Sequence, residues 1–265
     1  MPGPRKKTLY ELINKGAIKA IIFDFDGTIL DVNEPLHKSV AEVFQKHGIY
    51  GEWEQTMAQV GSVLDTVQAI PLPKIILEAY DIFNLVTALE GYRMIKKLRV
   101  AASIFSKYQK LAENAKLCQG VELLLAALAE KVPLYIVSHN LTIKVQESLA
   151  KHKLAQYFAG VYGADQLPAL KPNPEAVAFA AAQVGPHKPE EIVVVGDMPT
   201  DIQAGQAAGY WTVAVSTGFI PYSHLEAAQP DLLVRNFVEF YDALEGGQNS
   251  HLEAIKKVAP VASHA

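Results

Sequence analysis

Short apolar runs alternate with helical patterns over most of the second half of the chain. Four runs are predicted to be buried strands: residues 132–137, 158–162, 192–195 and 211–215. Between and before them, apolar residues at helical spacing predict helices at residues 121–130, 142–152, 174–184 and 201–208. Strands that alternate with helices favour βαβ crossovers and a mostly parallel sheet covered on both faces.

The two ends of the chain extend this pattern. Residues 17–23 read as a first buried strand, and residues 231–234 as an added edge strand. A short amphipathic helix is predicted at residues 8–14, closed by Gly16, and is expected to dock on the body of the protein or on a partner chain. The C-terminal segment 246–265 is expected to be peripheral, with a helix near residues 252–258.

Residues 35–115 have a different character, because they contain no strand-like runs. Their apolar residues recur at helical spacing, as in Leu36, Val40, Val43 and Phe44, or in Met94, Ile95 and Leu98. Pro71 and Pro73 interrupt the region. The predicted fold is therefore α/β: a Rossmann-like, doubly wound core with an inserted all-helical domain. We expect residues 1–33 and 116–265 to form the core and residues 34–115 the insert.

The composition of the chain narrows the classes of function that it can have. The 265 residues are half hydrophobic and carry a net charge of −4, which gives no bias toward nucleic acid or an anionic membrane. No apolar run has the length of a membrane span, and no signal-peptide core follows the basic residues 1–7. The single cysteine, Cys118, excludes an intrachain disulfide, and we expect it to be a small buried side chain in a cytoplasmic protein.

Chemically active side chains follow several of the predicted strands. In an open α/β sheet, ligands bind beyond the carboxyl ends of the strands. The residues expected at that edge are Asp24, Asp26, Ser138, His139, Asn140, Asp197 and Asp201, with Lys171 in a loop between them. Three loops thus bring carboxylates and a hydroxyl to one edge, and a fourth brings an ammonium.

This set suits phosphoryl transfer. Carboxylates such as Asp24 and Asp197 are hard ligands, and Mg²⁺ is the usual ion where phosphate is also bound. Lys171 is expected to keep Asp24 ionised, and an ionised aspartate can attack phosphorus to form an aspartyl-phosphate. Asp26 is placed to protonate the leaving oxygen and later to deprotonate water, while Ser138 can donate to phosphoryl oxygens.

The arrangement closely resembles the haloacid dehalogenase superfamily. The resemblance rests on Asp24 to Thr28, Ser138, Lys171, and Gly196-Asp197 with Asp201, in this order between residues 17 and 218. It implies a helical cap domain at the insert and Mg²⁺ held by the side chains of Asp24 and Asp197 and by the main-chain carbonyl of Asp26. It also implies that Asp201 supports metal-bound water or Lys171. Thr28 and Ser138 are expected at the phosphate.

The expected activity is Mg²⁺-dependent hydrolysis of a small phosphorylated metabolite, such as phosphoglycolate, a sugar phosphate or a nucleotide, by a monomer or homodimer. The overall layout most resembles phosphoglycolate phosphatases. A phosphosugar mutase would share every core residue, and Thr28 favours the phosphatase because mutase relatives often carry valine there. A receiver-like signalling module also uses an acidic pocket with a lysine, but the large helical insert argues against it.

Two neighbours of Ser138 leave alternatives open. His139 stands where the family often has asparagine, and it is expected either to contact substrate or to pack as an ordinary side chain. Asn140 has the same two interpretations. The basic run at residues 93–99 is expected to be the solvated face of an amphipathic helix rather than a recruiting site.

Overall fold

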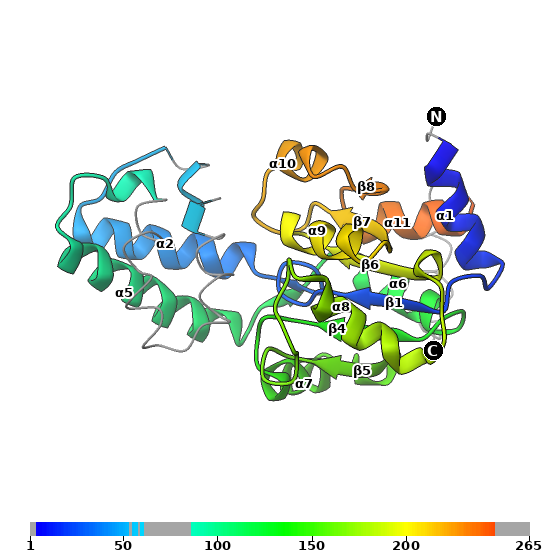
Figure 1. Ribbon diagram of the computed structural model, residues 1–265. Coiled ribbons are helices and arrows are strands. Elements are labelled where there is room, and N and C mark those ends of the chain that lie inside the picture. Colours follow the sequence, from blue (N-terminus) through cyan, green and yellow to red (C-terminus); the bar gives the residue numbers. More distant parts are fainter. Residues whose placement is uncertain (1–3, 53–54, 58, 61–85, 247–265) are drawn as a thin grey trace, which may run out of the picture.

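A six-stranded parallel sheet forms the centre of the protein in this computed structural model, which describes residues 4–52, 55–57, 59–60 and 86–246 (Figure 1). The strand order is β5-β4-β1-β6-β7-β8, and every neighbouring pair is parallel. The strands are β1 (Ala20–Phe23), β4 (Leu134–Val137), β5 (Phe158–Tyr162), β6 (Ile192–Gly196), β7 (Trp211–Val215) and β8 (Leu232–Val234). The predicted α/β class and the edge position of the last strand are confirmed.

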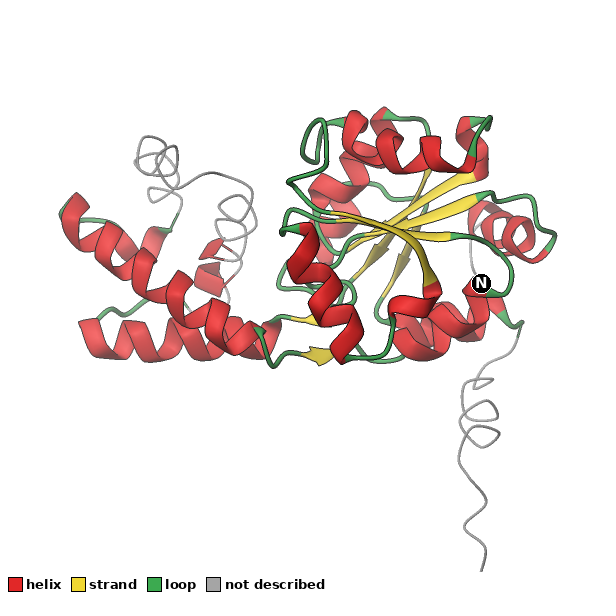
Figure 2. Cartoon of the chain, turned by 90° about the horizontal axis from the view of Figure 1, so that it is seen from below, coloured by secondary structure: helices red, strands yellow, loops and turns green. Residues whose placement is uncertain are grey.

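Helices cover both faces of this sheet (Figure 2). The helices labelled in Figure 1 are α1 (Pro4–Asn14), α2 (Asn33–His47), α5 (Met94–Ala112), α6 (Val121–Ala129), α7 (Thr142–Lys151), α8 (Pro174–Ala181), α9 (Pro199–Ala207), α10 (Tyr222–Ala227) and α11 (Phe237–Leu244), of which α2 and α5 lie apart from the sheet. Short 3₁₀ turns lie at Thr87–Leu89, Ala155–Tyr157, Ala182–Val184 and Pro189–Glu191. None of the helices in these ranges combines the length and the apolar character needed to cross a membrane.

The central strand β1 shows why the sheet needs two covering layers. Its side chains alternate between faces, so Ile21 and Phe23 join one apolar cluster, with α6 and α11, while Ala20 and Ile22 join another, with α8 and α9. All four are essentially inaccessible to solvent. Burying a large apolar side chain contributes about 1.5–3 kcal/mol. The uninterrupted apolar sequence of β1 is therefore what a strand covered on both faces requires.

The N-terminal helix α1 packs on the body of the protein, against α11. Its Leu9 and Ile13 are buried, and the Tyr10 ring meets Phe240 edge-on at 5.8 Å between centroids. The Asn14 side-chain amide also donates to the carbonyl of Leu244 at 2.8 Å. The helix begins four residues before its predicted start. It docks on the body of its own chain, which is one of the two expected alternatives.

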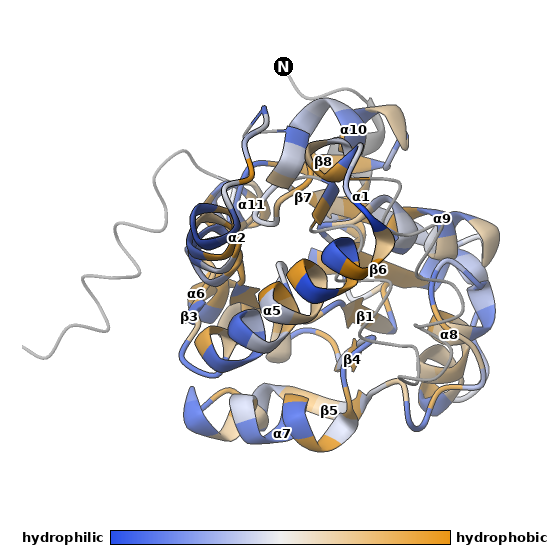
Figure 3. Ribbon diagram, turned by 90° about the vertical axis from the view of Figure 1, so that its left-hand side faces the viewer, coloured by the Kyte–Doolittle hydropathy of each residue, from blue (hydrophilic) through white to orange (hydrophobic). Residues whose placement is uncertain are grey.

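The insert projects from the edge where the strands end (Figure 1). The short strands β2 (Leu30–Asp31) and β3 (Lys116–Leu117) pair antiparallel where the chain leaves and re-enters the core. Seen from the insert side, α5 runs diagonally across the front of the core (Figure 3). An ion pair between Lys107 of α5 and Glu42 of α2 joins the two helices.

The sequence pattern was right for α2 and wrong in detail for α5. In α2 the predicted apolar residues are all buried. In α5 the buried face consists of Lys97, Val100, Ile104 and Tyr108, whereas Ile95 is 67% exposed. The spacing of the apolar residues fits two overlapping faces of this helix, so it could not show which face is buried. Pro71 and Pro73 lie outside the described residues.

Other differences concern the C-terminal half. Helix α9 begins at Pro199 rather than at Asp201, because proline suits the first turn of a helix. Helices α10 and α11 were not predicted, although Phe237 and Phe240 of α11 are fully buried. The helix predicted at residues 252–258 lies outside the described residues.

Candidate active site

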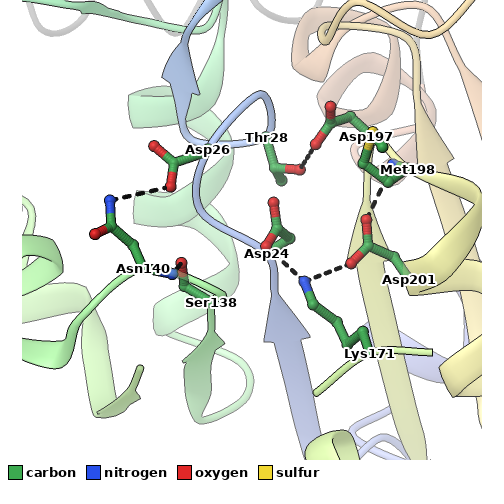
Figure 4. Close-up of polar contacts among 9 residues, drawn as sticks. All are labelled: Asp24, Asp26, Thr28, Ser138, Asn140, Lys171, Asp197, Met198 and Asp201. Atoms are coloured by element: carbon green, nitrogen blue, oxygen red, sulfur yellow. Dashed lines mark hydrogen bonds and ion pairs between the residues drawn. The ribbon is translucent and has the colours of Figure 1, made fainter. Parts of the chain in front are cut away.

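Asp24 and Lys171 form the centre of the site, at the carboxyl edge of the sheet (Figure 4). Asp24 directly follows β1, and its N–H donates to the carbonyl of Val195 at 2.8 Å, which extends the parallel ladder by one residue. Lys171 comes from the loop before α8, where it is followed by a cis proline. Its Nζ lies 2.6 Å from Asp24 Oδ1, and both side chains are at most 10% exposed.

Lys171 also binds Asp201 Oδ1 at 2.6 Å, so one ammonium bridges two carboxylates. Burial alone would lower the pKa of Lys171, but the charges of Asp201 and Asp24, together with their hydrogen bonds, raise it well above its usual range. The other oxygen of Asp201 accepts from the backbone N–H of Met198 at 3.0 Å. Asp201 is therefore a first-turn residue of α9 and not its N-cap, and of its two expected roles the contact with Lys171 is present.

Asp197 follows β6 and is 1% exposed. Its Oδ1 accepts a hydrogen bond from Thr28 Oγ1 at 2.7 Å. The hydroxyl of Thr28 is fully buried and donates to this carboxylate, a contact that the sequence did not predict. A hydrogen bond to a charged acceptor is stronger than one to a neutral group, so Thr28 fixes the orientation of Asp197.

Residues 24–29, between β1 and β2, are called the catalytic loop below. Asp26 lies on the opposite side of this loop from Lys171 (Figure 4). Its Oδ2 is 3.4 Å from Asn140 Nδ2, a long contact. Ser138 follows β4, and its Oγ accepts from the N–H of Asn140 at 3.0 Å, so the two residues form a local turn beside Asp26. His139, between them, is 6% exposed. The two carboxylates of the Asp-x-Asp sequence thus have different neighbours, although they stand two residues apart.

The charge balance of the site indicates a cation. Oxygens of Asp24, Asp197 and Asp201 all lie within 4.8 Å of one another. Within the part of the chain that the structure describes, Lys171 pairs with two of these three carboxylates. Like charges held this close in a poorly solvated region repel strongly, so a further cation would stabilise the group. A set of carboxylate oxygens fits a hard divalent ion such as Mg²⁺. The donor set therefore fits the expected metal.

Three further residues near the site make structural contacts. Asp165 accepts from both the N–H and the hydroxyl of Thr142 and thereby caps the start of α7. Asp31 accepts from the N–H of Asn33 in a turn before α2. Cys118 is buried, as expected, with its Sγ 3.6 Å from the carbonyl of Gly27.

The sequence reading missed the loop that follows β7. Thr217 donates from Oγ1 to the carbonyl of Gly27 at 2.7 Å and so touches the catalytic loop directly. The signal was available, because the strand at residues 211–215 was predicted and its carboxyl end had to lie at the same edge. The loop carries no charged residue, so no chemically active side chain pointed to it.

Comparisons with known proteins agree with this geometry. The family model described as haloacid dehalogenase-like hydrolase matches residues 21–215. A phosphoglycolate phosphatase from Photorhabdus laumondii is 26% identical over 239 residues, covering 86% of this chain and 92% of that protein. A pyrophosphatase, PpaX, from Oceanobacillus iheyensis is 25% identical over 224 residues, covering 83% and 94%.

Solved structures share the fold. A haloacid dehalogenase-like family hydrolase from Streptococcus pneumoniae superposes with a TM-score of 0.60 at 23% identity, covering 86% of this chain and 98% of that one. A β-phosphoglucomutase from Clostridium difficile gives 0.56 at 18% identity, covering 89% and 96%. With the family match extending over most of the chain and over all four motifs of the site, the protein belongs to the haloacid dehalogenase-like hydrolases.

Proposed function

We propose that the protein is a Mg²⁺-dependent phosphatase of small phosphorylated metabolites that acts through an aspartyl-phosphate at Asp24. The observation that carries the proposal is the position of the Lys171 ammonium, 2.6 Å from both Asp24 and Asp201, beside Asp197. Relatives named as a phosphoglycolate phosphatase and a pyrophosphatase support transfer of phosphate to water.

Asp24 is the nucleophile in this proposal. One of its carboxylate oxygens attacks phosphorus, the bond from phosphorus to the leaving oxygen breaks, and Asp26 gives that oxygen its proton. Asp26, now ionised, then takes a proton from water, whose oxygen attacks the same phosphorus and releases inorganic phosphate and the Asp24 carboxylate. Lys171 orients Asp24 and balances its charge throughout.

The remaining residues bind and position. Asp24, Asp197 and the main-chain carbonyl of Asp26 would hold Mg²⁺, which supplies positive charge against the phosphoryl oxygens. Ser138 and the loop with His139 and Asn140 would contact the phosphoryl group. Residues 34–115 would form a cap over a core made of residues 1–33 and 116–265, and this cap would limit the access of bulk water.

A panel of phosphorylated compounds tests the function directly. It should contain phosphoglycolate, sugar phosphates, nucleotides and inorganic pyrophosphate, each assayed for phosphate release with Mg²⁺ and with EDTA. We expect Mg²⁺-dependent release from at least one small phosphomonoester and none from Asp24→Asn. This variant should still fold, as circular dichroism can check, because Lys171 keeps its ion pair with Asp201. A hexose 1-phosphate converted to its 6-phosphate without phosphate release would show a mutase instead.

A further inference from the structure

The loop after β7 joins two parts of the protein that meet at the site. Thr217 Oγ1 donates to the carbonyl of Gly27, in the catalytic loop, at 2.7 Å. The carbonyl of Thr217 accepts from Asn33 Nδ2, in the first turn of α2, at 2.6 Å. One residue with no charge of its own thus connects the sheet to the catalytic loop and to the start of the helical insert.

The same loop forms one wall of the space that holds Asp197. A methyl group added at Gly27 or at Gly218 would overlap Oδ2 of Asp197. Two glycines from different loops therefore flank this carboxylate, and a larger residue at either position would have to displace it. Gly27 also has a φ of +84°, which other residues rarely adopt. The carboxylate lies in a slot whose width depends on how far apart the two loops are.

Thr217 is the residue that sets this distance. It is adjacent to Gly218 in sequence and bonded to Gly27, so its hydroxyl links the two walls. The Cys118 thiol also lies 3.6 Å from the carbonyl of Gly27, but a thiol is a weak hydrogen-bond donor. The N–H of Gly27 bonds within its own loop, to the carbonyl of Leu30 at 2.8 Å, and so does not bind the second wall.

We propose that Thr217 is a positioning residue that holds the loops of Gly27 and Gly218 around the Asp197 carboxylate and so fixes that carboxylate relative to Asp24. The inference rests on the proposed function, in which Asp197 is a Mg²⁺ ligand. Thr217 acts through Asp197 and is not assigned a contact with substrate. Partners that orient a metal ligand typically change metal affinity or activity by about 10- to 100-fold when they are removed.

Thr217→Val tests the proposal, because valine keeps the shape of threonine and removes the hydroxyl. Calorimetric titration of the protein with Mg²⁺ alone should show about 10-fold weaker binding or worse. With a substrate from the panel, kcat should fall by a similar factor while KM changes by less than about 3-fold, since the loss lies in alignment. Thr217→Ser keeps the hydroxyl and should restore both values.

Thr212→Val is the matched control. Thr212 lies on β7 itself, is buried, and donates to Asp231 at 3.1 Å, away from the catalytic loop. We expect this variant to lose stability but to keep wild-type Mg²⁺ affinity. If Thr217→Val fails to fold, Asn33→Ala, which removes the second contact of the loop, should weaken Mg²⁺ binding in the same direction.

A folded Thr217→Val with wild-type Mg²⁺ affinity and kcat would overturn the inference, as would equal losses in Thr217→Val and Thr217→Ser. Failure of the proposed function has a different signature: wild type would then bind no Mg²⁺ or release no phosphate from any compound of the panel.

Discussion

The Lys171 ammonium lies 2.6 Å from the Asp24 carboxylate, and both groups are almost completely buried. An aspartate in this position keeps its negative charge because its partner is a fixed positive charge. The lysine is held in turn by Asp201. In the proposed mechanism it would therefore remain in place when Asp24 reacts with phosphorus, and the pair would serve both the reactivity of Asp24 and its recovery in each turnover.

Replacing Lys171 by methionine should destabilise the protein and remove activity. Loss of one partner from a buried ion pair leaves charge without compensation and costs about 3–5 kcal/mol. Denaturant unfolding at neutral pH measures this cost. Lys38→Met is the control, because Lys38 pairs with Glu34 on an exposed helix face, where solvent screens the pair, and its loss should change the unfolding free energy far less. Equal costs for the two variants would contradict the structural role of Lys171.

The ion pair between Lys171 and Asp24 also determines how the unfolding free energy should depend on pH in the alkaline range. The pKa of Lys171 is raised in the folded protein, so its contribution is complete below the pKa of an unfolded lysine, about 10.4, and is lost as pH rises from there toward the folded value. Above pH ~10.4, the unfolding free energy of wild type should fall more steeply than that of Lys171→Met, by about 1.4 kcal/mol per pH unit. Parallel curves would show that the folded protein does not retain this proton.

Asp26→Asn should separate the two proton transfers from the attack by Asp24. Asparagine cannot donate a proton to the leaving oxygen, so hydrolysis of alkyl phosphates should slow by about 100- to 10,000-fold. p-Nitrophenyl phosphate has a leaving group that needs little protonation, and its first step should be much less affected. A burst of p-nitrophenolate followed by slow turnover is the expected signature. An equal loss in the first step on both substrate types, measured before the steady state, would argue against Asp26 as the acid.

Thr28→Val should weaken Mg²⁺ binding without preventing folding. The Thr28 hydroxyl donates to Asp197 Oδ1 at 2.7 Å, and its removal leaves the proposed metal ligand without this orientation. We expect Mg²⁺ affinity, measured by calorimetry, to fall by about 10- to 100-fold. Thr28→Ser keeps the donor and should bind like wild type. Wild-type affinity in the valine variant would show that Thr28 does not orient Asp197 for metal.

Cys118 should resist thiol reagents in the native protein. Burial raises the pKa of its thiol, and the negative charges of Asp197 and Asp31 raise it further. Because only the thiolate reacts, labelling should be slower than for an exposed thiol by on the order of a hundred-fold or more. The chain has one cysteine, so labelling in denaturant should reach one equivalent. Rapid labelling of folded protein would contradict the buried position beside Gly27.

The sequence was most informative where chemistry and strand pattern coincide. Asp24 and Asp197 could be placed because each ends an apolar run, and parallel strands end at one edge of a sheet. Lys171 stands in a loop, so its bridge between two carboxylates depended on tertiary folding, and only the order of the motifs pointed to it. Ile95 shows the opposite case. Its spacing correctly predicted a helix, but its side chain lies on the exposed face of that helix and not on the buried one.

The contacts of loops without charged residues were the hardest features to predict. Thr217 looks like an ordinary turn residue, and its importance comes from two contacts with residues more than 180 positions away in the sequence. The hydrogen bond from Thr28 to Asp197 was likewise not predicted, because no local pattern reveals that the two side chains lie within hydrogen-bond distance. Both are relationships between loops, which depend on the assembled sheet rather than on local sequence.

The most direct test of the account is detection of the phosphorylated enzyme. Wild-type protein mixed with radiolabelled acetyl phosphate and Mg²⁺, and quenched in acid within milliseconds, should carry label on the peptide that contains Asp24. The label should be lost in hydroxylamine, as expected for an acyl phosphate, and Asp24→Asn should carry none. Label on another residue, or turnover by folded Asp24→Asn at the wild-type rate, would contradict the central claim.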